Sequence, residues 1–283
     1  MKILISMLFL MLTACAQKNE NRSVFVEDIK VHSAGIVGGK EITAEDSEIA
    51  SSLVFIQEVQ SPTKAPGCTG TLITKRTVLL AAHCVRFAQF IKNPEVVYLY
   101  FSPTPLFGGG DTVRKPLKII SHISFGTQAN TKDPFDLALI HLAEDAPAHA
   151  KPAFIANEIP EFLYTDSFLI AGYGKTVNFR QRQVDPIKLR SVEVPLLFSW
   201  LKNKYENRAY SDFFYFDQRS GKGACAGDSG GPAFFWNPVK SRWELVGVSE
   251  LAFNLEDPFK SCTGASAYIN ILKHKDWILS NLK

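Results

Sequence analysis

The sequence predicts a mainly β protein of the barrel or sandwich type. From residue 36 onward, short runs rich in Val, Ile, Phe, Tyr and Thr are separated by clusters of Pro, Gly and Asn, and few stretches carry apolar residues at helical spacing. Many short strands divided by turns in this way are typical of barrels and sandwiches. The expected strands span residues 53–57, 69–73, 78–81, 96–100, 117–120, 137–142, 168–172, 188–194, 213–216, 232–236 and 244–248.

Two further segments, 199–208 and 271–282, are expected to be helices. In the second, Ile271, Trp277, Ile278 and Leu282 share one apolar stripe, which indicates packing against the rest of the fold. The sequence contains no internal repeat and no His or Cys cluster with metal-ligand spacing. We therefore expect no metal site built from His or Cys, whereas the sequence does not decide on a structural calcium.

The composition is that of an ordinary folded protein. Of the 283 residues, 46% are hydrophobic and 21% charged, and 31 basic side chains nearly balance 28 acidic ones. This excludes disordered and collagen-like chains and a basic nucleic-acid-binding arm. The length suffices for one large β domain or two smaller lobes without a disulfide scaffold. Because the five cysteines are an odd number, at least one must have a role other than an internal disulfide.

The first residues have the pattern of an export signal. The apolar run 3–12 follows Lys2 and is too short for a bilayer core of about 30 Å, although a buried N-terminal strand is an alternative reading. The sequence LTAC at 12–15 resembles the bacterial lipobox, in which cleavage before the cysteine leaves a thiol that carries lipid. Residues 1–14 would then be a signal peptide and Cys15 a membrane anchor. Ordinary signal cleavage near Ala16 would instead discard Cys15, and both readings export the protein.

Residues 15–35 are expected to form a tether or pro-segment. The segment begins strongly polar and lacks sustained periodicity. In the lipobox reading it would join the lipid on Cys15 to the folded domain.

A serine held between small residues gives the strongest chemical signal. In the octapeptide CAGDSGGP at 225–232, the small neighbours allow a sharp backbone turn that exposes the hydroxyl of Ser229. Here the chain resembles the trypsin-like (chymotrypsin-fold) serine endopeptidases. The segment LAAHC at 80–84 is similar to the family's catalytic-histidine segment, and DLALI at 136–140 to its catalytic acid leading a buried strand. A Gly-rich turn with an inert serine is the alternative.

The resemblance implies a His83, Asp136 and Ser229 triad, in the family's chain order. Serine attack near neutral pH needs a base that titrates close to that pH, and imidazole, with a pKa of about 6.5, fits. Asp136 would accept the Nδ1 proton of His83 and fix its tautomer. Asp133 is an alternative acid, although Asp-Pro also favours a turn. The backbone N–H groups of Gly227 and Ser229 would form the oxyanion hole.

Surface or core roles are expected for the remaining histidines. These are His32, His122, His141, His149 and His274.

The sequence IVGG at 36–39 is similar to the family's mature N-terminus. The resemblance implies that cleavage frees the ammonium of Ile36 to pair with Asp228, whereas an ordinary edge strand is the alternative. Gly35 departs from the family pattern, since the residue before the cleavage point is neither Lys nor Arg. A protease that prefers small residues, such as this one acting on its own copies, fits Ser33-Ala34-Gly35 better.

The resemblance also locates a primary specificity pocket. Its base would be Gly223, six residues before Ser229, and its walls would include Ser249, Leu251 and Ser266, with a register open by one residue. An acid at the base would select Lys or Arg, and none is present. Glu250 and Leu251 follow Ser249 where the family has Trp and Gly. We therefore expect a preference for small or medium apolar residues.

The resemblance covers residues 36–283 and implies two six-stranded antiparallel Greek-key barrels, about 36–155 and 156–283, followed by a C-terminal α-helix. Two disulfides are implied, Cys68–Cys84 and Cys225–Cys262, although four cysteines permit three connectivities. The active site would lie between the barrels.

The expected function is a serine endopeptidase that acts through an acyl-enzyme on protein or peptide substrates and is made as a zymogen. We expect a monomer with no cofactor and no nucleic-acid partner. The precursor would be a lipoprotein in the bacterial envelope until cleavage before Ile36 releases it. The alternative is a binding module of the same fold that never becomes catalytically competent, for which Gly35 and Glu250 leave room.

Overall fold

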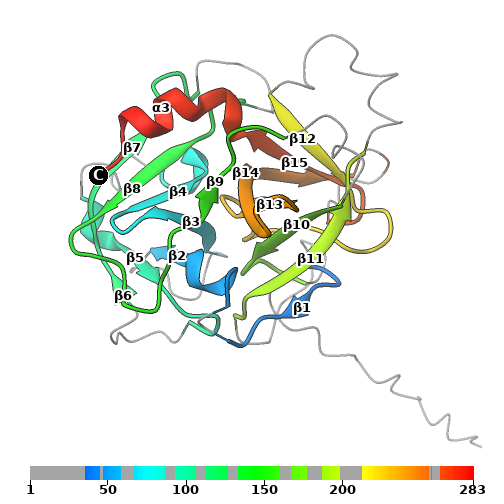
Figure 1. Cartoon of the computed structure of the whole chain (residues 1–283), viewed down its shortest axis with the longest axis horizontal. Coiled ribbons are helices and arrows are strands. Elements are labelled where there is room, and N and C mark those ends of the chain that lie inside the picture. Colours follow the sequence, from blue (N-terminus) through cyan, green and yellow to red (C-terminus); the bar gives the residue numbers. More distant parts are fainter. Residues whose placement is uncertain are drawn as a thin grey trace, which may run out of the picture. The chain divides into compact units, whose positions relative to one another are not determined.

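The computed structural model of the protein consists mainly of two curled, largely antiparallel sheets (Figure 1). It describes residues 36–44, 47–58, 67–86, 93–105, 113–126, 133–159, 167–176, 187–197, 212–254, 256 and 262–283. All of them belong to the second of two compact units, residues 31–283. The expected signal peptide, Cys15, His32, Gly35 and the helix expected at 199–208 lie outside the described residues. No helix in the described ranges has the length and apolar character needed to cross a membrane.

The first sheet has seven strands in the order β6-β5-β2-β3-β4-β8-β7. Its apolar residues are nearly continuous because both faces are buried. In β2, Val54 and Ile56 face one core while Leu53 and Phe55 face another, which is shared with the second sheet. The strands are β2 Leu53–Glu58, β3 Cys68–Thr74, β4 Thr77–Leu80, β5 Val97–Tyr100, β6 Val113–Arg114, β7 Pro116–Ser121 and β8 Ala138–Leu142.

The second sheet has eight strands, seven of them in the order β1-β11-β10-β13-β14-β15-β12, while β9 pairs in parallel with β14. A bridge between Leu196, just after β11, and Phe216 in β12 closes this sheet on itself. The strands are β1 Lys40–Glu41, β9 Phe154–Ile155, β10 Ser167–Gly172, β11 Arg190–Pro195, β12 Phe213–Asp217, β13 Pro232–Asn237, β14 Arg242–Phe253 and β15 Ala265–Asn270.

The predicted fold class is confirmed, with differences in strand number and length. The sheets have seven and eight strands because β1, β6 and β9, of two residues each, extend the two expected sets of six. β15 was not expected from its sequence, ASAYIN, yet all six of its residues are buried, so packing outweighs its modest β propensity. β14 continues five residues beyond the expected end at Val248 through a bulge between Ser249 and Leu251.

The C-terminal residues pack on the first sheet. The expected helix is a 3₁₀ turn, Ile271–His274, followed by α3, Lys275–Ser280, which lies near β7 and β8 in Figure 1. Beyond it, the carbonyl of Lys283 accepts a hydrogen bond from Thr74 Oγ1 at 3.0 Å, and its N–H donates to Thr77 Oγ1 at 3.2 Å. Conversely β1 and β9, both within the range expected for the first barrel, pair with the second sheet. Each sheet therefore includes contacts from the other half of the chain.

Candidate active site

The three candidate catalytic residues lie on loops from both sheets. His83 is in the 3₁₀ turn Ala82–Cys84 directly after β4, Asp136 comes just before β8, and Ser229 lies in the turns that precede β13. β4 and β8 are antiparallel neighbours, and the last residue of β4 pairs with the first residue of β8. The histidine and the acid therefore follow and precede these strands at the same end of the pair. The serine comes from the second sheet.

His83 and Asp136 are joined at two points. Asp136 Oδ2 lies 2.5 Å from His83 Nδ1, and Asp136 Oδ1 accepts a hydrogen bond from the backbone N–H of His83 at 2.7 Å. The Asp136 side chain is 4% exposed, whereas the His83 side chain is 29% exposed. The backbone bond fixes the carboxylate relative to the turn, so that its second oxygen orients the ring. The outer edge of the imidazole remains available to a reactant.

Asp133, the alternative acid, has other partners. Its Oδ2 accepts from the N–H of Gly126 at 2.7 Å and its Oδ1 from the N–H of Phe135 at 2.9 Å. Its own N–H donates to Glu250 Oε1 at 2.7 Å. Asp133 therefore organises the loop before Asp136 rather than the His83 ring.

The serine loop approaches the first sheet closely at Gly230. This residue has a φ of +81°, and a methyl group there would lie 2.4 Å from the carbonyl oxygen of Thr69 and 3.0 Å from Ala81 N. Ala81 precedes the 3₁₀ turn that holds His83. The N–H of Gly230 donates to Ser249 O at 2.8 Å. Only glycine permits both this conformation and this contact.

Ser229 lies beside the histidine segment without a bond to the histidine itself. Its carbonyl oxygen accepts from Thr69 N at 2.9 Å and lies 3.7 Å from Cys84 Sγ. Among the described residues, no hydrogen bond joins the Ser229 hydroxyl to His83. The serine loop therefore contacts β3 at Thr69 and the histidine segment at Cys84, and not through the Ser229 hydroxyl.

The peptide that carries the Gly227 N–H is held from behind. The carbonyl of Ala226 accepts a hydrogen bond from Lys175 N at 2.8 Å. In a trans peptide the carbonyl and the following N–H point in opposite directions, so this bond turns the Gly227 N–H away from Lys175. Gly227 itself has a φ of +100°, a conformation that L side chains rarely adopt.

Asp228 is a fully buried acid. Its Oδ1 accepts from Gly174 N and its Oδ2 from Cys225 N, both at 2.8 Å. Burial raises the pKa of this carboxyl to about 7, although the two backbone hydrogen bonds act in the opposite direction. Within the described part of the chain, no Lys, Arg or His forms an ion pair with it.

The residues that follow the expected cleavage point are packed against the second sheet. Ile36 is 0% exposed and packs with a cluster that includes Phe168, Ala224 and Tyr268. Val37 next to it forms an antiparallel bridge with Gly223. Gly35, on the other side of the expected cleavage point, lies outside the described residues.

The expected specificity pocket is supported from beneath by a residue that the sequence did not single out. Gln218 is 0% exposed, and its Nε2 donates to Ala224 O at 3.0 Å and to Cys262 O at 3.2 Å. Its Oε1 accepts from Ala224 N at 2.9 Å. The side chain thus joins Ala224, the residue after Gly223, to Cys262 of the Cys225–Cys262 disulfide. A glutamine directly after the strand FFYFD belongs to no recognisable motif, so sequence patterns alone could not find it.

The other expected pocket residues belong to paired strands. Ser249 and Ser266 are 3% and 0% exposed, and Leu251 is partly buried. Glu250, the residue between Ser249 and Leu251, is the extra residue of the β14 bulge. The disulfides Cys68–Cys84 and Cys225–Cys262 are both present, beside His83 and beside the pocket segment. Because its sulfurs are bonded to each other, the group Cys68, His83 and Cys84 is not a metal site.

The four described histidines outside the site have packing contacts. His122 stacks on Phe135 at 5.0 Å between ring centroids and also contacts Trp277 and His274. Burial, together with the charge of His122, lowers the pKa of His274 to about 4. His141 and His149 each bond a backbone carbonyl through Nε2.

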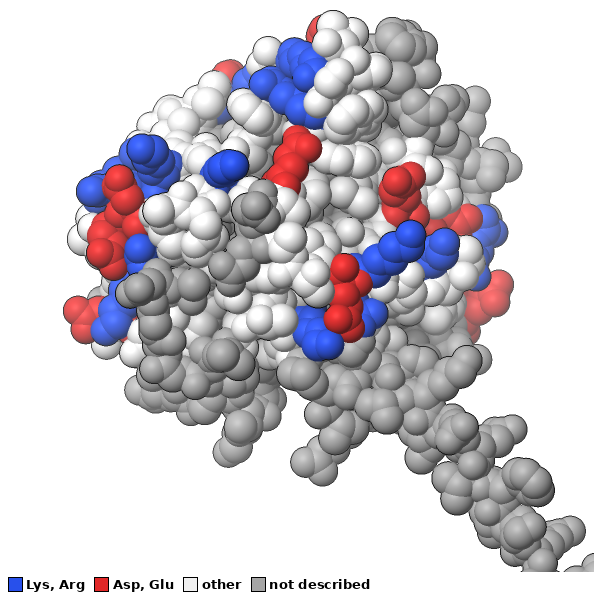
Figure 2. All heavy atoms as spheres, turned by 60° about the horizontal axis from the view of Figure 1, so that its bottom comes forward, with Lys and Arg blue, Asp and Glu red and all other residues white. Residues whose placement is uncertain are grey.

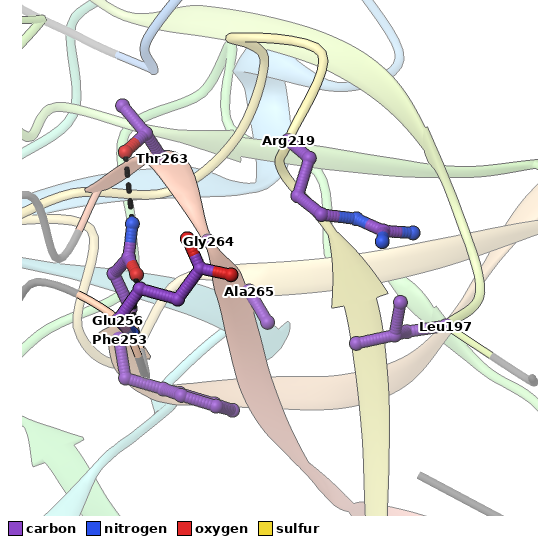
Figure 3. A pocket seen from close by; sticks show the side chains of 8 residues that line it. Leu197, Arg219, Phe253, Glu256, Thr263, Gly264 and Ala265 are labelled. Carbon is purple, nitrogen blue, oxygen red and sulfur yellow. Dashed lines mark hydrogen bonds between the residues drawn. The ribbon is translucent and has the colours of Figure 1, made fainter. Parts of the chain in front are cut away.

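Two surface features lie outside the site. A hollow of about 210 Å³ is lined by residues that include Arg219, Glu256 and Thr263, and none of the expected catalytic residues lines it (Figure 3). On the face shown in Figure 2, basic and acidic side chains lie next to one another. Among the surface ion pairs, Glu41 pairs with both Lys188 and Arg190.

The fold and site together define a two-sheet β protein in which a buried Asp136 bonds a partly exposed His83 beside a Gly-rich serine loop. Residues 36–278 match the family model described as Trypsin. The chain is 30% identical over 210 residues to a trypsin of Simulium vittatum, covering 69% of this chain and 78% of that protein. It is 27% identical to serine protease 28 of Mus musculus, with 88% and 93% covered, and 27% identical to cationic trypsin-3 of Rattus norvegicus, with 75% and 78% covered.

The chain belongs to the trypsin family of serine proteases.

Proposed function

We propose that this protein is a serine endopeptidase that hydrolyses peptide bonds through an acyl-enzyme formed on Ser229. The observation that carries the proposal is the double contact of Asp136 with His83, at Nδ1 and at the backbone N–H. It holds the ring with Nε2 directed away from the acid, as a general base requires. The serine loop beside Cys84 supplies the nucleophile.

The reaction has two halves, and in each half His83 first accepts a proton from the nucleophile and then gives it to the leaving group. The Ser229 hydroxyl turns toward His83 Nε2 as substrate binds, since such contacts often tighten only in the substrate complex. Its oxygen attacks the scissile carbonyl carbon while its proton passes to Nε2, and the leaving amine takes that proton. Water then attacks the ester with His83 as base, which releases the acid and restores Ser229. Asp136 holds the Nδ1 proton and stabilises the imidazolium throughout.

The oxyanion that forms in each half is bound by the N–H groups of Gly227 and Ser229. The bond from Lys175 N to Ala226 O supports this role, because it directs the Gly227 N–H to the opposite side of the peptide.

Activation follows cleavage between Gly35 and Ile36. The new ammonium of Ile36 pairs with Asp228, whose buried carboxyl has a raised pKa in the uncleaved chain. The bridge from Val37 to Gly223 supports this model, because it already holds Val37, the residue after Ile36, against a residue that lies five positions before Asp228.

The preferred residue before the scissile bond is small or medium and apolar. Gly223 provides no charge at the base of the pocket, and Leu251 narrows one wall. A peptide library should therefore give cleavage mainly after Ala, Val or similar residues, and dominant cleavage after Lys or Arg would contradict the assignment.

The precursor is exported and held at a membrane by lipid on Cys15, and cleavage before Ile36 releases a monomeric domain. Both disulfides join residues within 68–262, so neither ties residues 15–35 to the domain. A palmitate analogue should label the full chain but not the Cys15→Ser variant. Active domain that still sediments with membranes after cleavage would overturn the release model.

A fluorophosphonate probe tests the enzymatic function directly. The processed wild type should be labelled, Ser229→Ala should not, and Ser220→Ala, at an exposed serine, should be labelled normally. N-terminal sequencing of the labelled form should begin at Ile36. The missing bond between Ser229 and His83 leaves an inactive binding module as the second candidate. Unlabelled wild type that begins at Ile36 would establish that candidate instead.

A further inference from the structure

Thr69 connects the first sheet to the serine loop at two points and to Tyr173, just after β10, at a third. It is the second residue of β3, follows Cys68 of the disulfide beside His83, and is 0% exposed. Its backbone N–H donates to Ser229 O at 2.9 Å. Its hydroxyl donates to Gly227 O at 3.1 Å and accepts from Tyr173 N at 3.1 Å.

The hydroxyl holds the peptide unit that links the two N–H donors of the proposed oxyanion hole. The Gly227 carbonyl belongs to the Gly227–Asp228 peptide, between the N–H of Gly227 and the N–H of Ser229. Lys175 N holds the preceding carbonyl, that of Ala226. The N–H of the Gly227–Asp228 peptide donates to Cys225 O at 3.0 Å, so the Thr69 hydroxyl holds the opposite side of a peptide that is already bonded on one side. Gly227 has no side chain and a φ of +100°, so these bonds, with that from Lys175 N, limit rotation of the peptides around it.

A second threonine on the same strand makes this role specific to Thr69. Thr71, two residues on and so on the same face of β3, is also 0% exposed. Its hydroxyl has no hydrogen-bond partner. Burial of a threonine in β3 therefore does not by itself require a bonded hydroxyl. Thr69 differs from Thr71 in what its hydroxyl contacts, namely Gly227 and Tyr173 across the boundary between the sheets.

We propose that Thr69 is a positioning residue for the oxyanion hole, a role that rests on the proposed endopeptidase function. Its hydroxyl joins a strand of the first sheet to the Gly227 carbonyl and fixes the direction of the adjacent N–H donors. Removing the hydroxyl leaves both Gly227 O and Tyr173 N without this partner in a buried place, so the loop gains alternative orientations. The transition state then loses stabilisation while ground-state binding is retained.

The test compares Thr69→Val, Thr69→Ser and Thr71→Val in protein that was expressed as the full chain and then cleaved before Ile36. The substrate is a peptide amide. Thr69→Val should lower kcat by about 10- to 100-fold, somewhat less than loss of a donor itself, with KM within about twofold of wild type. Thr69→Ser should stay within about threefold of wild type in kcat. Thr71→Val, the matched control, should leave both constants unchanged. A peptide boronic acid that mimics the transition state should bind Thr69→Val more weakly by a factor similar to the loss in kcat.

The outcomes separate this proposal from the function on which it rests. Wild type that neither hydrolyses peptides nor reacts with a fluorophosphonate overturns the endopeptidase and this role together. Active wild type with an unchanged kcat in Thr69→Val overturns only the role of Thr69. Equal losses in Thr69→Val and Thr71→Val, or no rescue by serine, would show a general packing effect and also overturn it. Should Thr69→Val not fold, Thr69→Cys takes its place, because the thiol is a weaker hydrogen-bonding group than the hydroxyl. The kcat of Thr69→Cys should lie below that of Thr69→Ser but above zero. A Thr69→Cys variant with the kcat of wild type would contradict the proposal.

Discussion

Val37 and Gly223 exchange two backbone hydrogen bonds, from Val37 N to Gly223 O at 2.9 Å and from Gly223 N to Val37 O at 3.0 Å. The second residue after the expected cleavage point is therefore paired with the expected base of the specificity pocket. Gly223 also lies five residues before Asp228, the proposed partner of the new ammonium. Through these two bonds, a change in the position of Val37, after the expected cleavage point, would also move Gly223 at the base of the expected pocket.

Replacing Val37 with proline should impair the pocket through the backbone. Proline lacks the N–H that donates to Gly223 O, so one of the two bonds is lost and the other is weakened. We expect kcat/KM of the processed enzyme to fall by about tenfold or more, in line with one to two kcal/mol for a buried bond. Steady-state kinetics on a peptide amide gives the measurement.

Val37→Ala keeps both backbone bonds and is the control for the loss of the side chain. The two variants should therefore differ clearly in kcat/KM. Equal values for proline and alanine would mean that the pairing with Gly223 does not support the pocket.

The stability of the uncleaved protein should depend on pH through Asp228. Its folded pKa of about 7 lies above the ordinary value of 3.8, so between these values the folded state binds a proton that the unfolded state has lost. Its contribution to stability is therefore complete below about pH 4 and is lost as the pH rises through 7. The loss amounts to about 4 kcal/mol at most. Urea unfolding between pH 4 and 8 measures it, with Asp228→Asn expected to remove this part of the slope.

Cleavage should reverse the sign of this effect. Once the Ile36 ammonium pairs with Asp228, the pKa of the carboxyl falls, and the ion pair stabilises the folded state at neutral pH. The difference between wild type and Asp228→Asn should then favour the wild type at pH 7. A processed protein that keeps the slope of the precursor would contradict the pairing.

Gln218 should be essential for the shape of the pocket. Gln218→Met has a similar length but removes the bonds to Ala224 N, Ala224 O and Cys262 O. Several buried polar groups lose their partner, so the free energy of unfolding should fall by about 2 to 4 kcal/mol, with a several-fold rise in KM. Chemical denaturation and kinetics on small apolar substrates test both effects.

The neighbouring Arg219→Ala is the matched comparison. Arg219 pairs with Asp217 at the surface with its side chain 64% exposed, so its removal should cost less than about 1 kcal/mol. If the two variants lost equal stability, the buried contacts of Gln218 would not have the proposed weight.

The fold class could be predicted because its signals are local. Apolar runs such as 137–142 mark strands buried on both faces, and Gly-rich turns mark their ends. β15 was missed because small and polar residues such as Ala265 and Ser266 become strand only when β12 and β14 cover them. The predicted strand 244–248 is shorter than β14, because the polar residues Ser249 and Glu250 interrupt the apolar run. The strand continues past them through a bulge, which depends on the register with β15.

The candidate site was predictable to the extent that short segments carry it. His83, Asp136 and Ser229 each stand in a recognisable stretch of sequence. Thr69 and Gln218 do not, since their contacts join residues 158 and 44 positions apart and depend on how the sheets meet. Glu250 was noticed as a departure, but its bond to Asp133 N, 117 positions away, could not be foreseen.

The exchange of terminal segments between the sheets has a consequence for the order of folding. β1 near residue 40 pairs at the edge of the second sheet, whereas Lys283 bonds Thr74 and Thr77 in the first. During synthesis, the β3–β4 hairpin is made more than two hundred residues before Lys283. Its bonds from Thr74 and Thr77 to Lys283 can form only once that residue has been made. Neither sheet is complete without residues from the other half of the chain, so we expect the two sheets to fold together rather than one after the other.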